Sequence, residues 1–437
     1  MTDMSIYAKR RERLLKELGK GVAILKGAPE QTRSHDTEYP YRQDSDLFYL
    51  TGYTDPGAAM ILDPNNEENP FTLFVLPKDP KKEVWTGRRL SFEETKEVFG
   101  ANMVLDIAEF DGALPKAMTP AAEVYTNLNH DVTHQHRMLD HVRTVRGAVQ
   151  RTGGGPEGLR SIGALLHAHR LIKDDHEIAL IQKASDISAE AHIKAMKAVK
   201  PGMYEYQLQA IMESHFVYEG GAGPAYTSIV GAGDNATVLH YIKNRDQIKE
   251  DDLVLIDAAT EYEMYASDIT RTFPAQGRFN DSQKELYEVV LHAQKEVLAA
   301  CKPGVTFQEL HDLDLRLLVE GMVKVGLLEG EVDTIIEEQT YQDYFMHKTG
   351  HWLGLDVHDM GKYMREGDSV KLEPGMVFTI EPGIYVHSQS KAPERFRGIG
   401  IRIEDDILIT EDGYHNFTSA VPKEIDEIEA LMAENNA

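Results

Sequence analysis

The chain has 437 residues, more than one compact core usually holds, so two domains are expected. Its net charge of −26 argues against nucleic acid as a partner, because phosphate binding requires a basic surface. The single cysteine, Cys301, excludes an internal disulfide and a zinc site built from cysteines.

The first part of the chain alternates apolar runs with helical patterns. Strands are predicted at residues 21–25, 59–62 and 71–76, and helices at residues 7–18 and 92–99. This alternation is typical of a mixed α/β domain, which we place at residues 1–172. The start of the chain lacks the continuous apolar stretch of a secretory signal, and no later segment is apolar enough to span a bilayer. No membrane contact and a cytoplasmic location are therefore expected.

A strong helix pattern opens the second predicted domain, residues 173–437. Asp174 or Asp175 can cap its N-terminus. Apolar residues at helical spacing then give it one apolar face, namely Ile178, Ile181, Ala184, Ile187 and Ala191.

Two parallel stretches indicate an internal duplication in this domain. Residues 198–208 and 300–310 both contain Lys-Pro-Gly between two helical patterns. Each stretch is followed by an apolar strand that ends in an acid, at Asp257 and at Glu381. Two matches in the same order predict two related halves that converge on one site.

Asp257 and Asp268 are predicted to meet across a hairpin. Asp257 ends the apolar run 253–256, and Asp268 lies in the next predicted strand, 265–273, after a turn at 261–264. A carboxylate at the end of a buried strand needs an explanation, because burying it bare is costly. Taken singly, either acid is about as often a helix cap or a salt-bridge partner as it is a functional residue.

Glu404 lies in a segment of alternating apolar residues. With a period of two, Arg402 and Glu404 face one side of the predicted strand 398–407. A surface ion pair between them is the alternative, and such pairs contribute little. Because the alternation continues to Ile409, we predict a central strand instead.

Histidines gather in the same half of the chain. His347, His351 and His358 lie in one glycine-broken segment, and His240 follows another apolar run. A lone histidine is usually structural, but three beside four strand-end acids indicate a site. Oxygen-rich ligation favours manganese, with cobalt, iron or magnesium behind it. Four acids could not crowd together without about two divalent ions, so a two-metal site is predicted.

Five motifs in the second predicted domain carry a family resemblance, which extends over nearly the whole chain. They are Leu-Ile-Asp257, Ser-Asp268-Ile-Thr-Arg-Thr-Phe-Pro, Gly-His351-Trp-Leu-Gly-Leu-Asp-Val-His358-Asp, Thr-Ile-Glu381-Pro-Gly and Ile-Arg-Ile-Glu404-Asp-Asp. They resemble the pita-bread metallopeptidases, and among these the aminopeptidase P family. The stretches 38–52 and 85–89 are similar to that family's first domain. The resemblance implies an α/β (α+β) fold, with an N-terminal creatinase/aminopeptidase P-type domain before a pita-bread domain of internal pseudo-symmetry.

The resemblance also implies a ligand set. Asp257 would bind one metal ion, His351 and Glu381 would bind the other, and Asp268 and Glu404 would bridge the two. Two divalent ions are implied, with Mn²⁺ ahead of Co²⁺, Fe²⁺ or Zn²⁺.

Roles in catalysis and substrate binding follow from the same resemblance. His240 and His358 would contact the scissile carbonyl, and Glu381 would also take a proton from metal-bound water. Arg402 and Tyr385 would position ligands and substrate. His347 would line the proline pocket. Trp85 would reach an active site, that of a neighbouring subunit in a homodimer or homotetramer.

The activity implied is that of an Xaa-Pro aminopeptidase, with a metal-bridging hydroxide attacking the peptide bond before proline. A prolidase, which cleaves only Xaa-Pro dipeptides, would share the metal ligands and remains an alternative. A non-catalytic pita-bread protein would be expected to lack them. The sequence departs from the family pattern at residues 348–350, where relatives carry smaller or apolar residues, and this bears on the shape of the pocket.

Overall fold

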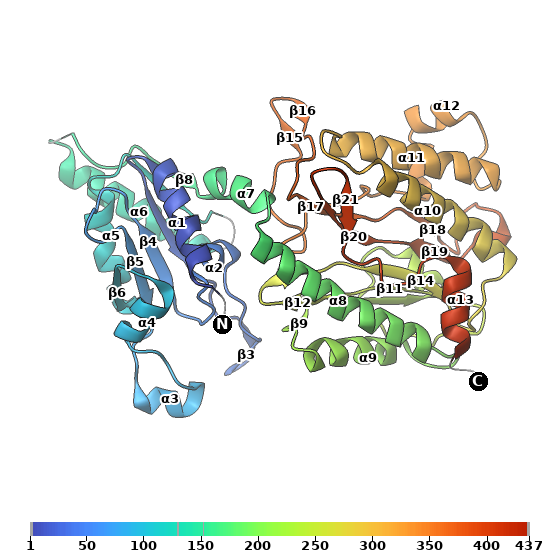
Figure 1. Cartoon of the computed structure of the whole chain (residues 1–437), viewed down its shortest axis with the longest axis horizontal. Helices are drawn as coiled ribbons and strands as arrows, with labels where there is room; N and C mark the ends of the chain where they lie inside the picture. Colours follow the sequence, from blue (N-terminus) through green and yellow to red (C-terminus); the bar gives the residue numbers. More distant parts are fainter. Residues whose placement is uncertain (1–2, 129–130, 152, 435–437) are drawn as a thin grey trace. The chain divides into compact units, whose positions relative to one another are not determined.

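The computed structural model describes residues 3–128, 131–151 and 153–434. The chain divides into two compact units, Met1–His169 and Arg170–Ala437, which Figure 1 colours from blue to green and from green to red. In the described ranges, no helix has both the length and the apolar character required to cross a membrane.

The first unit is built on a six-stranded mixed sheet in the order β6-β5-β4-β1-β7-β8. The strands are β1 (Val22–Lys26), β4 (Ala59–Leu62), β5 (Phe71–Val75), β6 (Met103–Asp106), β7 (Glu123–Thr126) and β8 (Gly158–Ser161), with a small hairpin of β2 (Thr32–Ser34) and β3 (Thr37–Glu38). The helices are α1 (Ser5–Leu18), α2 (Ser45–Thr51), α3 (Pro80–Thr86), α4 (Phe92–Phe99), α5 (Phe110–Met118) and α6 (Val132–Val149). α7 (Gly163–Leu171) leads out of this unit. The predicted mixed α/β character and the predicted strands and helices of this part are confirmed.

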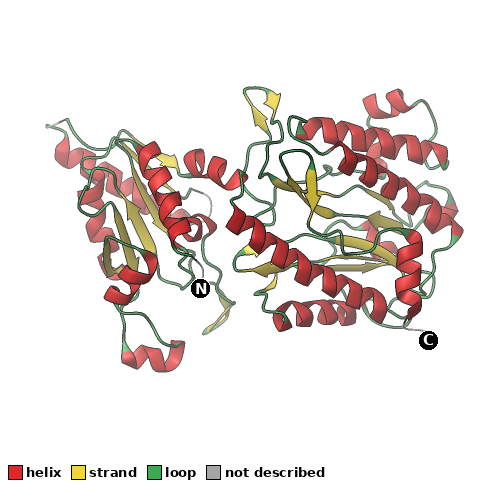
Figure 2. Ribbon diagram, in the orientation of Figure 1, coloured by secondary structure: helices red, strands yellow, loops and turns green. Residues whose placement is uncertain are grey.

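The second unit consists of two successive groups of helices and strands. The first group contains α8 (Asp175–Ala198), α9 (Glu205–Tyr218), β9 (Gly223–Pro224), β10 (Ile229–Ala232), β11 (Leu253–Asp257), β12 (Thr260–Tyr262), β13 (Tyr265–Ala266) and β14 (Thr270–Pro274). The second contains α10 (Asp281–Ala300), α11 (Phe307–Lys324), α12 (Val332–Glu337), β15 (Met364–Arg365), β16 (Asp368–Ser369), β17 (Val377–Ile380), β18 (Gly383–Val386), β19 (Ile399–Arg402), β20 (Asp405–Ile409), β21 (Tyr414–Asn416) and α13 (Ile425–Ala433). With the labels of Figure 1, Figure 2 shows the central strands of this unit between α8 and α9 on one side and α10 and α11 on the other, with the β15–β16 hairpin outside them.

The two groups repeat the same local hydrogen bonds, as the predicted duplication requires. In the first, the N–H of Gly202 donates to the carbonyl of Ile248 at 2.8 Å. In the second, the N–H of Gly304 donates to the carbonyl of Leu372, also at 2.8 Å. Both glycines follow the Pro of the repeated Lys-Pro-Gly and have positive φ, which a glycine adopts without strain.

α8 begins where the sequence predicts. The carboxylate of Asp174 accepts from the N–H of Glu177 at 2.9 Å, and the Glu177 carboxylate accepts from the N–H of Asp174 at 3.1 Å. This reciprocal capping satisfies two N–H groups that a helix end leaves unpaired. Ile181 and Ile187 of the predicted apolar face are buried, and Ile178 is half-buried.

The hairpin that carries Asp257 and Asp268 is divided between two sheets. β11 pairs with β14, and Asp257 lies opposite Thr270, not Asp268. β13 pairs instead with β12 in a separate sheet, so the predicted continuous strand 265–273 is wrong at residues 267–269. In this break the N–H of Asp268 donates to the carboxylate of Asp406 at 3.0 Å and not to a neighbouring strand.

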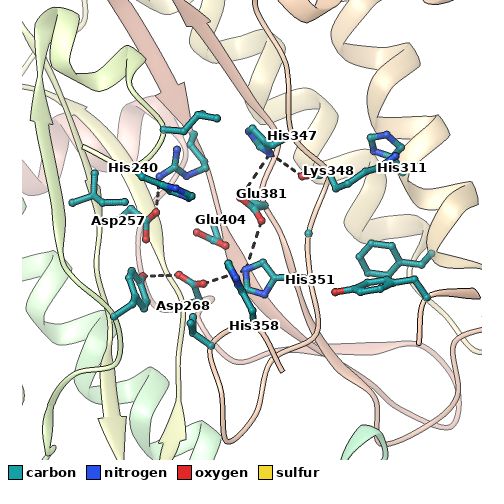
Figure 3. A pocket seen from close by; sticks show the side chains of 18 of the residues that line it. His240, Asp257, Asp268, His311, His347, Lys348, His351, His358, Glu381 and Glu404 are labelled. Carbon is teal, nitrogen blue, oxygen red and sulfur yellow. Dashed lines mark hydrogen bonds and ion pairs between the residues drawn. The ribbon is translucent and has the colours of Figure 1, made fainter. Parts of the chain in front are cut away.

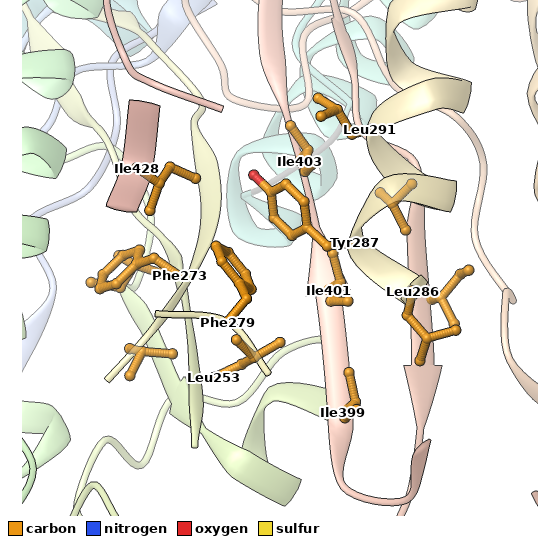
Figure 4. Close-up of a cluster of buried hydrophobic side chains, with 14 of the residues drawn as sticks. Leu253, Phe273, Phe279, Leu286, Tyr287, Leu291, Ile399, Ile401, Ile403 and Ile428 are labelled. Atoms are coloured by element: carbon orange, nitrogen blue, oxygen red, sulfur yellow. The ribbon is translucent and has the colours of Figure 1, made fainter. Parts of the chain in front are cut away.

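The segment around Glu404 is interrupted in the same way. β19 ends at Arg402 and β20 begins at Asp405, so Glu404 lies between two sheets. Arg402 and Glu404 are 3% and 2% exposed, which confirms a central position and excludes the surface ion pair. Ile399, Ile401 and Ile403 pack into the core that Figure 4 shows, beside Tyr287.

Candidate functional site

The second unit contains a cavity of about 800 Å³ where the ends of these strands meet (Figure 3). Nine residues singled out in the sequence line it, namely His240, Asp257, Asp268, His347, His351, His358, Glu381, Arg402 and Glu404. Tyr385 is 2% exposed, and its hydroxyl contacts two of these residues. Trp85 belongs to α3 of the first unit, where it is 88% exposed.

Strand ends and strand breaks place the four acids. Asp257 ends β11, and Glu381 directly follows β17. Asp268 and Glu404 lie in the two breaks, which meet because the N–H of Glu404 donates to the carbonyl of Thr270 at 3.1 Å. Asp257 thus keeps its place in the pairing of β11, whereas Asp268, Glu381 and Glu404 lie just outside the named strands.

His351 is held beside β17 in the orientation of a metal ligand. The N–H of Thr379 donates to the carbonyl of His351 at 2.9 Å. The Nδ1 of His351 lies 3.1 Å from the carbonyl oxygen of Trp352, so Nδ1 carries the proton and donates it. In the neutral ring the lone pair is then on Nε2, which lies 3.3 Å from Asp268 Oδ2 and 3.7 Å from Glu381 Oε1.

Asp268, His351 and Glu404 form one compact group within the cavity. Each offers one ligand atom, and these atoms lie within 4.8 Å of one another. Such a group of oxygen and imidazole donors suits a divalent cation.

The crowding of buried acids perturbs their pKa values strongly. Burial, and behind it the charges of Asp268 and Glu381, raises the pKa of Glu404 well above its usual range. Burial raises the pKa of Glu381 to about 7, and it raises that of Asp268 as well. Burial opposes the charged form of His351, but its contacts with Asp268 and Glu381 outweigh burial and raise the pKa to about 9. Positive charge placed among these acids would return them to the ionised form.

The carboxylate of Asp257 indicates whether metal ions fit this cavity, because only one of its two oxygens is hydrogen-bonded within the described part of the chain. Its Oδ2 accepts a hydrogen bond from Arg402 Nη2 at 2.5 Å. Its Oδ1 is buried and has no hydrogen-bond partner in the described part of the chain. An unsatisfied buried acceptor is costly, and a cation between Asp257 and the other acids would satisfy it. The residues present therefore fit metal ions.

Arg402 links the carboxylates to the far wall of the site. Besides Asp257, it donates from Nε to Thr270 Oγ1 at 3.0 Å and from Nη1 to Tyr385 OH at 3.0 Å. Thr270 in turn donates to Glu404 Oε2 at 2.7 Å. One guanidinium thus fixes two of the acids, which suits its planar fork of donors. The sequence placed Arg402 beside Glu404, but its direct partner is Asp257.

Three supporting residues escaped the sequence analysis. Tyr226 donates from its hydroxyl to Asp268 Oδ1 at 2.5 Å. Asp406 accepts from the backbone of Asp268, and Thr270 holds Glu404. Tyr226 lies in a loop without periodicity, so no local pattern could have identified it.

The loop that carries His240 is anchored by a buried carboxylate. Tyr241 donates from its hydroxyl to Glu205 Oε2 at 2.8 Å, and the N–H of Asp246 donates to the same oxygen at 2.9 Å. The other oxygen of Glu205 accepts from the N–H of Ala232 at 2.9 Å. His240 itself is exposed on the cavity wall, so these contacts of its neighbours restrain it.

The residue after His358 is anchored as well. Asp359 accepts from Lys173 Nζ at 3.0 Å and also from Arg170. Burial raises the pKa of such a carboxyl, but these two cations outweigh burial and lower that of Asp359. The rings of His351 and His358 lie 4.2 Å apart, so the anchored segment brings both to the same end of the cavity.

The chain matches family models over most of its length. The model for "Metallopeptidase family M24" matches residues 179–411, and that for "Aminopeptidase P, N-terminal domain" matches residues 7–125. The Xaa-Pro aminopeptidase of Escherichia coli (strain K12) is 40% identical over 428 residues, which cover 98% of this chain and 97% of that protein.

Solved structures agree in fold over the whole chain. The aminopeptidase PepP of Pseudomonas aeruginosa matches with a TM-score of 0.96 and 42% identity, covering 100% of this chain and 99% of that one. Escherichia coli aminopeptidase P with the inhibitor Pro-Leu matches with a TM-score of 0.95 and 39% identity, with the same coverage. The predicted family and fold class are confirmed. The chain therefore belongs to metallopeptidase family M24 and carries an aminopeptidase P N-terminal domain ahead of the metallopeptidase domain.

Proposed function

We propose that the chain is an Xaa-Pro aminopeptidase, which removes the first residue of peptides whose second residue is proline. The observation that carries this proposal is the cavity in which Asp257, Asp268, His351, Glu381 and Glu404 converge. This chain aligns with nearly the full length of two relatives that are named Xaa-Pro aminopeptidases. A structural neighbour is aminopeptidase P in complex with substrate.

The proposed ligand assignments keep the roles that the family resemblance implies, and the convergence of these residues in one cavity supports them. Asp257 would hold one divalent ion, His351 and Glu381 the other, and Asp268 and Glu404 would bridge them. Oxygen donors outnumber the one imidazole, which favours Mn²⁺ over Co²⁺, Fe²⁺ or Zn²⁺. Bound as a pair, such ions supply a hydroxide nucleophile at neutral pH and polarise the scissile carbonyl.

The other residues of the cavity would act on the substrate directly. Glu381 would accept the proton of the attacking water. His240 and His358 would donate to the carbonyl oxygen as negative charge develops on it. His347, held by its Nε2 contact of 2.8 Å with Tyr385 OH, would line the proline pocket. A bond before proline has no N–H, so recognition must come from the free amine, the carbonyl and the ring.

The assembly and the domain limits complete the proposal. We assign residues 1–172 to the N-terminal domain and residues 173–437 to the catalytic domain. Trp85 is exposed on a seven-residue helix with no buried residue, which suits insertion into a neighbouring subunit's site in a homodimer or homotetramer. The cytoplasmic location stays a prediction.

Peptide cleavage tests the activity. Metal-stripped protein is incubated with Xaa-Pro-Xaa, Xaa-Ala-Xaa and Xaa-Pro peptides, with and without Mn²⁺, and the products are identified by mass. We expect the proline tripeptide to lose its first residue only when metal is added, and the alanine peptide to stay intact. Cleavage of the dipeptide alone would mean a prolidase. No cleavage of any peptide would favour a binding role.

A further inference from the structure

Lys348 carries a positive charge on the cavity wall that pairs with no other described residue. Of the described residues that line the cavity, only Arg402 and Lys348 are permanently charged cations. The donors of Arg402 are engaged by Asp257, Thr270 and Tyr385. Lys348 is exposed, and its ammonium group makes no hydrogen bond or ion pair with the described residues. It is therefore available to a ligand.

The backbone of Lys348 is fixed although its side chain is free. Its carbonyl oxygen lies 2.8 Å from His347 Nδ1. The next residue, Thr349, is buried, and its hydroxyl donates to Asp314 Oδ2 at 2.7 Å. The carbonyl of Thr349 accepts from the N–H of Glu381 at 2.7 Å. The root of the lysine is thus held at a defined distance from the metal ligands.

Lys348 lies one residue beyond the side chain proposed to contact proline. Figure 3 shows it between His347 and His311, away from the four acids. His347 Nδ1 is 3.9 Å from Glu381 Oε2. Successive residues of an extended peptide are about 3.3–3.6 Å apart, so the residue after proline falls within reach of the flexible lysine stem.

Among the other described residues of this wall, both ring nitrogens of His347 are already engaged, by the carbonyl of Lys348 and the hydroxyl of Tyr385. Arg402 is also paired, with Asp257, Thr270 and Tyr385. Lys348 is then the one free cation that a substrate would meet here among the described lining residues.

We propose that Lys348 binds the carboxylate of the residue that follows proline, so that the enzyme prefers Xaa-Pro-Xaa tripeptides with a free C-terminus. This inference rests on the proposed function, because it places the peptide by its scissile bond. The same ammonium group could meet an acidic side chain at that position, and the two sources of the carboxylate are separable.

Three peptides test the proposal. Xaa-Pro-Gly has the α-carboxylate, Xaa-Pro-Gly amide lacks it, and Xaa-Pro-Asp amide supplies a side-chain carboxylate only. The variants are Lys348→Met, which keeps the length of the stem, Lys348→Arg, which keeps the charge, and Lys302→Met. Lys302 is an exposed lysine between α10 and α11 that does not line the cavity. Lys302→Met therefore removes the same charge as Lys348→Met at a position away from the substrate.

We expect wild type to favour Xaa-Pro-Gly over its amide in kcat/KM by roughly two- to fivefold, as for a partly exposed ion pair. Lys348→Met should abolish this preference by raising KM for Xaa-Pro-Gly, and it should leave kcat/KM for the amide unchanged. Lys348→Arg and Lys302→Met should retain the preference, and added salt should weaken it.

Other results would overturn the proposal. If Lys348→Met lost kcat/KM equally on Xaa-Pro-Gly and on its amide, Lys348 would shape the cavity and would not recognise charge. A preference that survives in Lys348→Met would place the carboxylate elsewhere. A Lys348-dependent gain for Xaa-Pro-Asp amide alone would assign the contact to acidic side chains. If wild type cuts none of the three peptides, the proposed function itself fails.

Discussion

Asp268→Asn is expected to abolish peptide hydrolysis and to lower the metal content of the purified protein. The amide keeps the size of the side chain but removes a charge and the ability to bridge two cations. It also leaves Glu404 and His351 without the acid that completes their group. The loss of kcat/KM should exceed the roughly 10²–10³-fold cost of removing one transition-state donor. Activity on an Xaa-Pro-Xaa peptide and metal analysis by mass spectrometry measure both effects.

Asp63→Asn serves as the control for this variant. Asp63 is a buried carboxyl directly after β4 in the first unit, and it does not line the cavity. Its Oδ1 accepts from the N–H of Asn65 at 2.9 Å, and an amide oxygen can accept the same bond. This variant should keep its metal and most of its activity. If Asp268→Asn remained active and fully loaded with metal, the bridging assignment would be wrong.

His358→Ala should lower turnover by about 10²–10³-fold, the typical cost of losing one donor to the developing oxyanion. Metal binding should be retained, because His358 is not among the proposed ligands. Its anchor, Asp359, stays paired with Lys173 and Arg170, so the segment should keep its course. The measurement is kcat and KM at saturating Mn²⁺, together with metal content.

His351→Ala gives a matched comparison with the same substitution. The two imidazole rings are only 4.2 Å apart, yet they are assigned different roles. His351→Ala should lose metal and activity together, and excess Mn²⁺ should restore part of the loss. A His358→Ala protein that purified without metal would show that His358 is a ligand and would require a new assignment.

Asp257, Glu381 and Glu404 could be predicted from sequence because each one stands at the end of, or within, a regular apolar pattern. Asp257 and Glu381 end buried strands, and the alternation around Glu404 indicated burial on both faces. Such a pattern is informative because a bare carboxylate rarely ends a buried strand without a partner. The duplication was visible for a similar reason, since the Lys-Pro-Gly turns have a local signature.

The relation between strands could not be predicted from the same patterns. No local pattern indicates that β13 and β14 belong to different sheets or that Glu404 lies between β19 and β20. Which sheet a strand joins depends on contacts across the chain, such as the one between Asp268 and Asp406. The pairing of Arg402 with Asp257 is long-range for the same reason. The position of Tyr226 also depends on the assembled fold.

A titration of metal-stripped protein with Mn²⁺, followed by bound metal and by activity in the same samples, tests the two-metal account most directly. The five converging ligands and the unsatisfied Oδ1 of Asp257 predict two ions per chain at full activity. Full cleavage of an Xaa-Pro-Xaa peptide with one ion per chain, and no further rise when a second ion binds, would contradict it.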